Sequence, residues 1–238
     1  AGNANQSLTG TGYAMTTEVH HKYGILRINL PNAGTSVYLS ESMVYTRTRL
    51  ELRSGMIDLN GKSFVIENGS HEAVSRTSGY VYSEDDQSFF VWKNIAAGSH
   101  EFPFGVNSSN YIPVLFTPLS GFGNDVSIST RSTGTSDNRP VPSNLLATVL
   151  SLVNIGFAED EVIDRWWKVN TGSMNANVTL KYAANENTLS IGNRLSPLGM
   201  RNWSGLSWDE PRGYGFAILS GIGSVTISNV SQFSNWIL

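Results

Sequence analysis

Alternating apolar and polar residues recur along the chain, and helical periodicity is nearly absent. In LRINL (26–30) the apolar side chains fall on one face, because successive residues of a strand point to opposite sides. The same two-residue period runs through DVSISTR (125–131), NVTLKY (177–182) and SVTISNV (224–230). Gly, Asn, Pro or Ser bounds each run, as is typical of turns. The pattern predicts an all-β protein, built as a two-sheet β-sandwich or jelly roll.

The segment LELRSGMIDLNGKSFVIENGS (50–70) has two interpretations. Asn60-Gly61 is typical of a tight β-hairpin turn, since both residues tolerate a positive φ. Alternatively, Gly55 and Gly61 mark corners of a short β-solenoid rung, in which successive strands stack. We therefore expect either a hairpin or a short solenoid-like segment in the first half. Because one such unit is evident, a long solenoid is not expected.

Three prolines interrupt the apolar stretch HEFPFGVNSSNYIPVLFTPL (100–119). Pro103 and Pro113 lack the amide donor that a central strand needs, so each indicates a strand start, an edge or a bulge. A phosphate-binding loop would need several glycines and a helix start, and the stretch has neither. We interpret 100–119 as a hairpin of edge type that belongs to the scaffold.

Composition changes along the chain indicate where it divides. The polar loop RSTGTSDNRPVPSN (131–144) separates a first β lobe (25–135) from a second (136–238), unless the two form one continuous domain. Residues 1–24 form a polar lead that contains a candidate exchanged strand. Only residues 143–155 offer a helical alternative, and a buried pair of strands fits them equally.

Overall composition narrows the classes of function. The chain of 238 residues has 16 basic and 19 acidic side chains, a formal net charge of −3, and no basic stripe for nucleic acid. It has no cysteine, which excludes disulfides and thiolate metal sites. No apolar run approaches the roughly 20 residues of a membrane span. Abundant Ser, Thr, Asn and Gly and the start AGNANQS favour an extracellular or outer-surface location.

No motif for catalysis or nucleotide binding is complete. GLSWD (205–209) has Asp209 in place of the last glycine of a nucleophile elbow, and each G-x-G lacks the third glycine of a dinucleotide loop. Asp160, Glu161 and Asp164 would need a cleft between them to act as a glycosidase pair; hydrogen bonding of Asp164 to backbone or an arginine is the simpler interpretation. The four histidines lack H-x-x-x-H spacing and are interpreted as structural. We expect no enzyme activity, no catalytic residues and no cofactor.

One acidic turn is a weak metal candidate. Glu84, Asp85 and Asp86 lie together in SEDDQS (83–88) and offer the oxygen ligands that Ca²⁺ prefers. They lack the spaced D-x-D-x-D-G pattern of a calcium loop. A solvated turn without metal is the favoured interpretation.

The stretch MRNWSGLSWDEPRGYGF (200–216) concentrates aromatic side chains among turn residues. Exposed rings of this kind stack on sugars or anchor protein interfaces, with polar neighbours that bind hydroxyl groups. The competing interpretation is that the rings fold back onto the sheet as hydrophobic plugs. The ligand or interface candidates are Trp203, Trp208, Tyr214, Arg201 and Arg212.

Four segments in order resemble large secreted and surface proteins of Bacteroidetes-type bacteria. FPFGVNSSNYIPVLFTP resembles their FPxG…YxPV segment, and EVIDRWWKV (161–169) resembles their VxDRxW strand. DLNGKSFVI (58–66) with VSRTSGYVYSE (74–84), and the ending SVTISNVSQFSNWIL (224–238) with its FSxW pattern, match as well. The resemblance covers about residues 50–238. It implies a surface or extracellular β-module, often cargo of type IX secretion, and no shared catalytic residues.

These observations together predict a non-catalytic structural or adhesive β-module outside the cell. The segment GTGYAMTTEVHHKYG (10–24) carries strand-forming residues, and Tyr13, Met15 and Val19 are the candidates to complete a neighbour's sheet. Head-to-tail exchange of this strand would give a filament. The expected partners are further copies of the chain or cell-surface molecules. The alternative is a carbohydrate-binding module that uses the aromatic patch.

Overall fold

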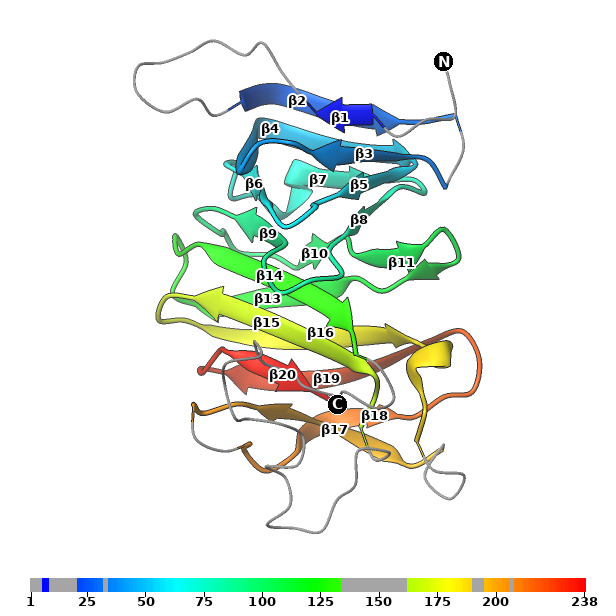
Figure 1. The fold of residues 1–238 in the computed structure, drawn as a ribbon. Helices are drawn as coiled ribbons and strands as arrows, with labels where there is room; N and C mark the ends of the chain where they lie inside the picture. Colours follow the sequence, from blue (N-terminus) through cyan, green and yellow to red (C-terminus); the bar gives the residue numbers. More distant parts are fainter. Residues whose placement is uncertain (1–5, 9–20, 32–33, 134–161, 190–194, 206–207) are drawn as a thin grey trace.

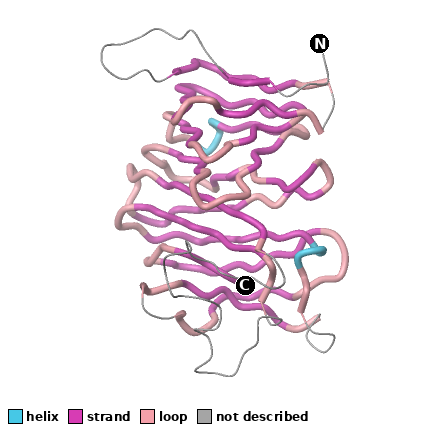
Figure 2. Tube along the Cα trace, viewed as in Figure 1, coloured by secondary structure: helices cyan, strands magenta, loops and turns pink. Residues whose placement is uncertain are grey.

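The computed structural model describes residues 6–8, 21–31, 34–133, 162–189, 195–205 and 208–238. Strands dominate this part of the chain, as Figure 2 shows, and its helical elements are two 3-10 turns. These turns are η1 (His71–Ala73) and η4 (Ala184–Glu186). The predicted all-β class is confirmed.

The strands form a large 14-stranded mixed sheet, a four-stranded sheet and a two-stranded sheet. Those of the first hundred residues are β1 (Gln6–Leu8), β2 (His21–Asn29), β3 (Ser36–Leu39), β4 (Met43–Ser54), β5 (Met56–Asp58), β6 (Ser63–Ile66), β7 (Val74–Arg76), β8 (Tyr80–Tyr82) and β9 (Phe89–Trp92). The others are β10 (His100–Phe102), β11 (Gly105–Asn107), β12 (Asn110–Tyr111), β13 (Val114–Ser120), β14 (Val126–Ser132), β15 (Arg165–Thr171), β16 (Asn175–Ala183), β17 (Pro197–Asn202), β18 (Arg212–Phe216), β19 (Ile222–Val230) and β20 (Asn235–Ile237).

The first half of the chain winds in stacked parallel rungs. The strands β1, β3, β5 and β8 pair in parallel in the four-stranded sheet, and β2, β4, β6 and β9 pair in parallel at one end of the large sheet. Strand β4 turns a corner, because its first part pairs with β6 and its second part with β7. Figure 1 shows these rungs stacked downward from β1 and β2. The first half therefore contains a short β-solenoid.

The turn at Asn60-Gly61 is a corner of this solenoid. Both residues have positive φ, 51° and 72°, as the sequence indicated. The flanking strands do not pair with each other, however, since β5 pairs with β3 and β8 while β6 pairs with β4 and β9. The hairpin alternative is wrong for this segment, and so is the expectation of a single solenoid unit.

Apolar side chains stack in columns inside the solenoid. Leu26 pairs with Leu50, which pairs in turn with Val74, and Val37 pairs with Ile57 on another side of the rung. Leu50 and Ile57 are fully buried. Burial of a side chain of this size stabilises the folded state by about 1.5–3 kcal/mol. In-register stacking therefore lets each rung present a matched apolar surface to the next.

Beyond β9 the large sheet changes to antiparallel pairing. Its path runs β9-β14-β15-β20-β17 and continues β18-β19-β16-β13-β10. Strand β17 joins the two runs, because it pairs with β20 of the first and β18 of the second. Both runs contribute buried side chains to one core. The described strands thus form one large mixed sheet and two small sheets, with no closed barrel, and the predicted two-sheet sandwich or jelly roll stays a prediction.

The proline-rich stretch 100–119 forms a hairpin, as predicted. Strands β10 and β13 pair in antiparallel register, and β11 pairs with β12 at the tip. Pro103 and Pro113 lie between strands, where no ladder donor is needed. Of the pair β10 and β13, β10 is the edge strand, because β13 also pairs with β16. Phe102, Phe104 and other apolar side chains of the stretch are fully buried, which makes it part of the core.

Strand pairing crosses the predicted lobe boundary at 135/136. Strand β14 pairs with β15, and β13 pairs with β16. One hydrophobic cluster extends from Leu26 in the first half to Trp236 in the second. The segment 143–155, for which helix and strand were both open, lies outside the described residues.

Candidate functional site

Two of the predicted aromatic candidates pack into the fold. The rings of Trp203 and Trp208 meet edge to face at 5.2 Å, and their backbones form a β-bridge. Trp208 is 8% exposed and forms a small separate core with Val162 and Ile237, against which Trp203 packs. Trp208 therefore has no ring face available to a ligand.

The two predicted arginines interact with the neighbouring turn. Arg201 donates from Nη1 to the carbonyl oxygen of Asp209 at 3.1 Å, and Arg212 Nη2 lies 3.7 Å from Asp209 Oδ2. Burial lowers the pKa of Arg201, and the charge of Glu210 opposes this shift. Both arginines thus contact Asp209 of the neighbouring turn, Arg201 by a hydrogen bond and Arg212 by a longer ion pair between partly exposed side chains.

The third predicted ring, Tyr214, is the exposed member of the set. It is 66% exposed on β18, beside Phe216, which is 46% exposed and meets it edge to face at 5.0 Å. Gly215 between them pairs with Val225, and a Cβ at Gly215 would lie 2.2 Å from the carbonyl oxygen of Ser224. Strand β18 therefore approaches β19 closely and turns both rings outward. The sequence analysis did not name Phe216, although the alternation in RGYGF places it on the same face of a strand as Tyr214.

The solenoid has an open end at its first rung. Among the described strands, β1 pairs only with β3, and β2 pairs only with β4. Ile25 on β2 is 57% exposed there. Figure 1 shows this end opposite the end that carries β17 and β18. We call the residues of β1 and β2 the open end of the solenoid.

The candidate exchanged strand at 10–24 is described only in part. Tyr13, Met15 and Val19 lie outside the described residues, so their role stays a prediction. Residues 21–24 belong to β2, and His21 pairs with Val44 of the same chain. This part of the segment thus completes the chain's own solenoid.

The carboxylates of the turn 84–86 bind protein groups. Glu84 accepts a hydrogen bond at 2.8 Å from Arg165 Nη2. Asp85 accepts from the backbone N–H and the hydroxyl group of Ser88, at 2.6 and 2.7 Å. In the described part of the chain, no group of three His, Asp or Glu side chains is placed to hold a metal ion. The oxygens of Glu84 and Asp85 thus stabilise the turn and its neighbour β15.

Arg165 is fully buried at the centre of a charged network. Its Nε and Nη2 donate to Glu186 Oε1 at 2.8 and 2.5 Å, and its Nη1 donates to Thr130 Oγ1 at 3.0 Å. Burial alone would lower the pKa of Arg165, but the charges and hydrogen bonds of Glu84 and Glu186 outweigh it and raise the pKa. Arg165 thus stays charged and ties the turn after β8 to η4.

The carboxylate Asp164 is buried next to this network. It is 4% exposed, and its Oδ2 accepts a hydrogen bond from Thr188 Oγ1 at 2.7 Å. Asp160 and Glu161, its predicted partners in a glycosidase pair, lie outside the described residues. Burial and hydrogen bonding make Asp164 a structural group of the fold.

His100 is a second buried polar side chain. Its ring nitrogens lie 3.1 Å from the carbonyl oxygen of Gly98 and 3.0 Å from that of Gly69, and its ring meets Trp92 edge to face. Burial lowers the pKa of His100, and the two carbonyl contacts oppose this. The ring thus joins two loops of the solenoid as a hydrogen-bonded structural residue.

Comparison of the chain with protein-family models, with curated proteins and with solved structures finds no match. The resemblance to Bacteroidetes-type surface modules therefore stays a prediction. No helix among the described residues is long and apolar enough to cross a membrane.

Proposed function

We propose that this chain is a non-catalytic structural and adhesive β-module that acts outside the cell or on its outer surface, and that its copies associate end to end. The observation that carries this proposal is the open end of the solenoid. Strands β4 and β6 each have parallel partners on two sides, whereas β1 and β2 each have one among the described strands. The N–H and C=O groups on the open side of an edge strand can pair with a further strand.

The stacked columns indicate what a further rung must offer. Leu26 and Ile28 of β2 continue the inward columns of Leu50 and Leu52 in register. Ile25 faces outward and is exposed at this end. A second chain that presents strand backbone and apolar side chains would extend both the ladder and the columns.

The opposite end of the molecule offers exposed apolar side chains, while the backbone of β18 already pairs with β17 and β19. Tyr214 and Phe216 are exposed on β18, and Leu219 after β18 is also exposed. In Figure 1, β18 lies at the end remote from β1 and β2. Contact between unlike ends of two copies is heterologous, and it propagates into a filament unless the rotation between copies closes a ring.

The side chains that could support chemistry have structural partners in the described residues. Glu84 and Glu186 pair with Arg165, Asp164 bonds Thr188, and His100 bonds backbone carbonyl groups. Groups fixed in this way favour a scaffold over an enzyme. Sparse charge and abundant Ser, Thr, Asn and Gly favour secretion to the cell surface, where partners would be further copies or surface molecules.

Sedimentation velocity of the full chain over a concentration series tests the proposal. We expect association in the original sequence and at least about tenfold weaker association in Ile25→Lys, because a charge on an edge strand opposes strand addition. Tyr214→Lys should weaken association similarly from the other end. Leu119→Lys is the matched control, because Leu119 is exposed on β13, away from both ends. A chain that stays monomeric throughout, or equal association in Ile25→Lys and Leu119→Lys, contradicts the proposal.

A deletion tests the predicted role of residues 1–19, which include β1 of the open end. Removal of residues 1–19 takes away β1 together with Tyr13, Met15 and Val19. If these residues complete a neighbour's sheet, the deletion abolishes association while the thermal unfolding of the monomer persists. Unchanged association would show that copies meet without this strand.

Carbohydrate binding by the aromatic patch is the second candidate function. The exposure of Tyr214 favours it, because a free ring face can stack on a sugar. Trp208 no longer supports it, since that ring is buried. If this candidate is right, Tyr214→Ala must abolish retardation of the protein in a polysaccharide-containing native gel.

A further inference from the structure

A shallow hollow lies on the side of the molecule, between the β13–β14 loop and the β15–β16 turn. Its volume of about 560 Å³ falls within the range of small-ligand sites. Every residue that lines it is either glycine or carries a polar side chain. The lining residues are Gly123, Asn124, Asp125, Ser127, Asn170, Thr171 and Gly172.

The hollow has a rigid base, because its floor is a strand pair. Ser127 of β14 lies opposite Asn170 of β15, and Asn170 Nδ2 is 3.4 Å from Ser127 Oγ. The chain neighbours of these two residues point the other way: Val126 and Ile128 on β14 and Val169 on β15 are buried in the main core. The two polar side chains are therefore held at fixed positions on the outer face of the sheet.

The loops at its rim are also braced. Asn124 Nδ2 donates to the carbonyl oxygens of Gly121 and Ser173, at 2.8 and 3.1 Å, so the loop and the turn are tied together. Asp125 Oδ1 accepts from the backbone N–H of Asn94 at 2.9 Å. The rim is thus formed before any ligand arrives.

The polar side chains that face the hollow come from one face of the strand pair. Ser127 and Asn170 lie opposite each other on the outer face, and Asp125 shares that face two residues before Ser127. Thr171 lies opposite the core residue Val126 and shares the inward face with Val169, so its buried hydroxyl group is not part of the binding surface.

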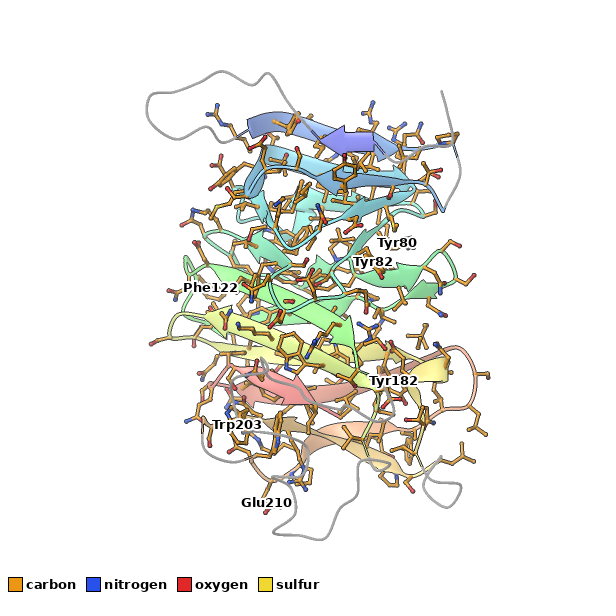
Figure 3. The ribbon with its side chains drawn as sticks, in the orientation of Figure 1. Tyr80, Tyr82, Phe122, Tyr182, Trp203 and Glu210 are labelled. Atoms are coloured by element: carbon orange, nitrogen blue, oxygen red, sulfur yellow. The ribbon has the colours of Figure 1, made fainter. Side chains whose placement is uncertain are left out.

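An exposed aromatic ring lies on the β13–β14 loop, next to the residues that line the hollow. Phe122 precedes the lining residue Gly123 and is 52% exposed. Figure 3 shows Phe122 at the side of the stack, away from the open end and from β18. Sugars combine an apolar C–H face with hydroxyl groups, so an aromatic ring beside amide, carboxylate and hydroxyl groups matches both parts.

We propose that this hollow is a binding site for a neutral carbohydrate. Phe122 stacks on the C–H face of a sugar ring, and Asn170, Asp125 and Ser127 bind its hydroxyl groups. Asp125 is the charged residue of the lining, and its negative charge, with a net charge of −3 for the chain, disfavours anionic polysaccharides. The site stands independently of end-to-end association and of Tyr214.

Native affinity electrophoresis of the full chain tests this site. Gels containing laminarin, galactomannan, xyloglucan, amylopectin or alginate are compared with a polysaccharide-free gel, which accounts for self-association. We expect retardation by at least one of the four neutral polysaccharides and none by alginate. Phe122→Ala and Asn170→Ala should each weaken the apparent affinity about tenfold, while Tyr214→Ala leaves it unchanged.

Each other outcome overturns the proposal. No retardation in the four neutral gels shows that the hollow does not bind such ligands. Retardation that persists in both Phe122→Ala and Asn170→Ala, or that is lost only in Tyr214→Ala, places binding elsewhere. Retardation by alginate alone contradicts the assigned charge preference. Equal thermal unfolding of all variants, whose substituted side chains are exposed, shows that any loss of binding is local.

Discussion

Replacement of Arg165 by alanine tests how the two halves of the fold are joined. The change removes the hydrogen bonds to Glu84, Glu186 and Thr130, and it leaves the Glu186 carboxylate 3% exposed without its cation. Removal of one partner from a buried ion pair costs about 3–5 kcal/mol, since the other charge stays buried. The free energy of unfolding of a whole domain of ordinary size is only about 5–15 kcal/mol. Arg165→Ala should therefore remove a large share of the total stability.

Urea unfolding followed by tryptophan fluorescence measures this loss. Trp92, Trp166, Trp167 and Trp236 are fully buried, so unfolding changes their emission. With a slope of about 2–3 kcal/mol/M, a loss of about 3–5 kcal/mol lowers the urea midpoint by roughly 1–2.5 M. If Arg165→Ala does not fold, Glu186→Gln removes one charge at nearly constant shape and should give a smaller loss in the same direction.

An exposed ion pair provides the matched control. Arg27 Nε lies 2.7 Å from Glu51 Oε2, as close as the buried contacts, but the Arg27 side chain is 51% exposed. Water and salt screen such a pair, so Arg27→Ala should shift the midpoint far less than Arg165→Ala. Equal shifts for the two variants would refute the reasoning, because burial would then not determine the cost.

Four further substitutions test local features of the fold. Burial lowers the pKa of His100, so as pH falls the unfolded chain, with a pKa near 6.5, binds the proton first. Stability should be unaffected by this group above pH 6.5 and decline below it, and His100→Gln should flatten that decline in urea titrations; equal slopes would contradict the shift. Gly55 and Gly61 both have positive φ, but a Cβ at Gly55 would also lie 2.6 Å from Leu30 Cδ1. Gly61→Ala should therefore cost about 1–2 kcal/mol and Gly55→Ala clearly more, and the reverse order by thermal unfolding would be evidence against the corner packing. Tyr182 Oη donates to the Phe216 carbonyl oxygen at 3.0 Å, so Tyr182→Phe should cost about 1 kcal/mol in urea unfolding, and no loss would show that this bond is not used.

Local alternation predicted the strands whose two faces differ. In β2, Leu26 and Ile28 are buried and Arg27 is exposed, and in β16 Val178 and Leu180 are buried between partly exposed polar residues. Such strands have the core on one side and solvent on the other, so the two-residue period is present in the sequence itself. The all-β class follows from this pattern alone.

The same pattern left the pairing of the strands open, since residues 50–70 fitted both a hairpin and a β-solenoid rung. Arg27 and Glu51 pair across adjacent rungs although they are 24 positions apart. The stacked positions share only apolar character, as in Leu26, Leu50 and Val74, and their neighbours differ from rung to rung. A turn such as Asn60-Gly61 is a local property, whereas the partner of the next strand depends on the whole fold. For this reason the sequence predicted the turn at Asn60-Gly61 but did not decide between the hairpin and the solenoid rung.

Exposure of aromatic side chains also depended on the fold. Trp208 and Tyr214 occur in one short stretch, yet a small core covers Trp208 while Tyr214 stands free on β18. The Arg165 network was equally hidden, because Glu84 and Arg165 are 81 positions apart. Phe122 gave no signal in the sequence, since its loop becomes part of a hollow only when the β15–β16 turn lies beside it.

Electron microscopy of the purified full chain at high concentration tests the central claim, that this protein is a scaffold which assembles through the open end of its solenoid. The account predicts particles joined end to end in rows or filaments, which Ile25→Lys reduces to single particles. Single, unassociated particles in every field of the original sequence, or rows that persist unchanged in Ile25→Lys, would contradict it.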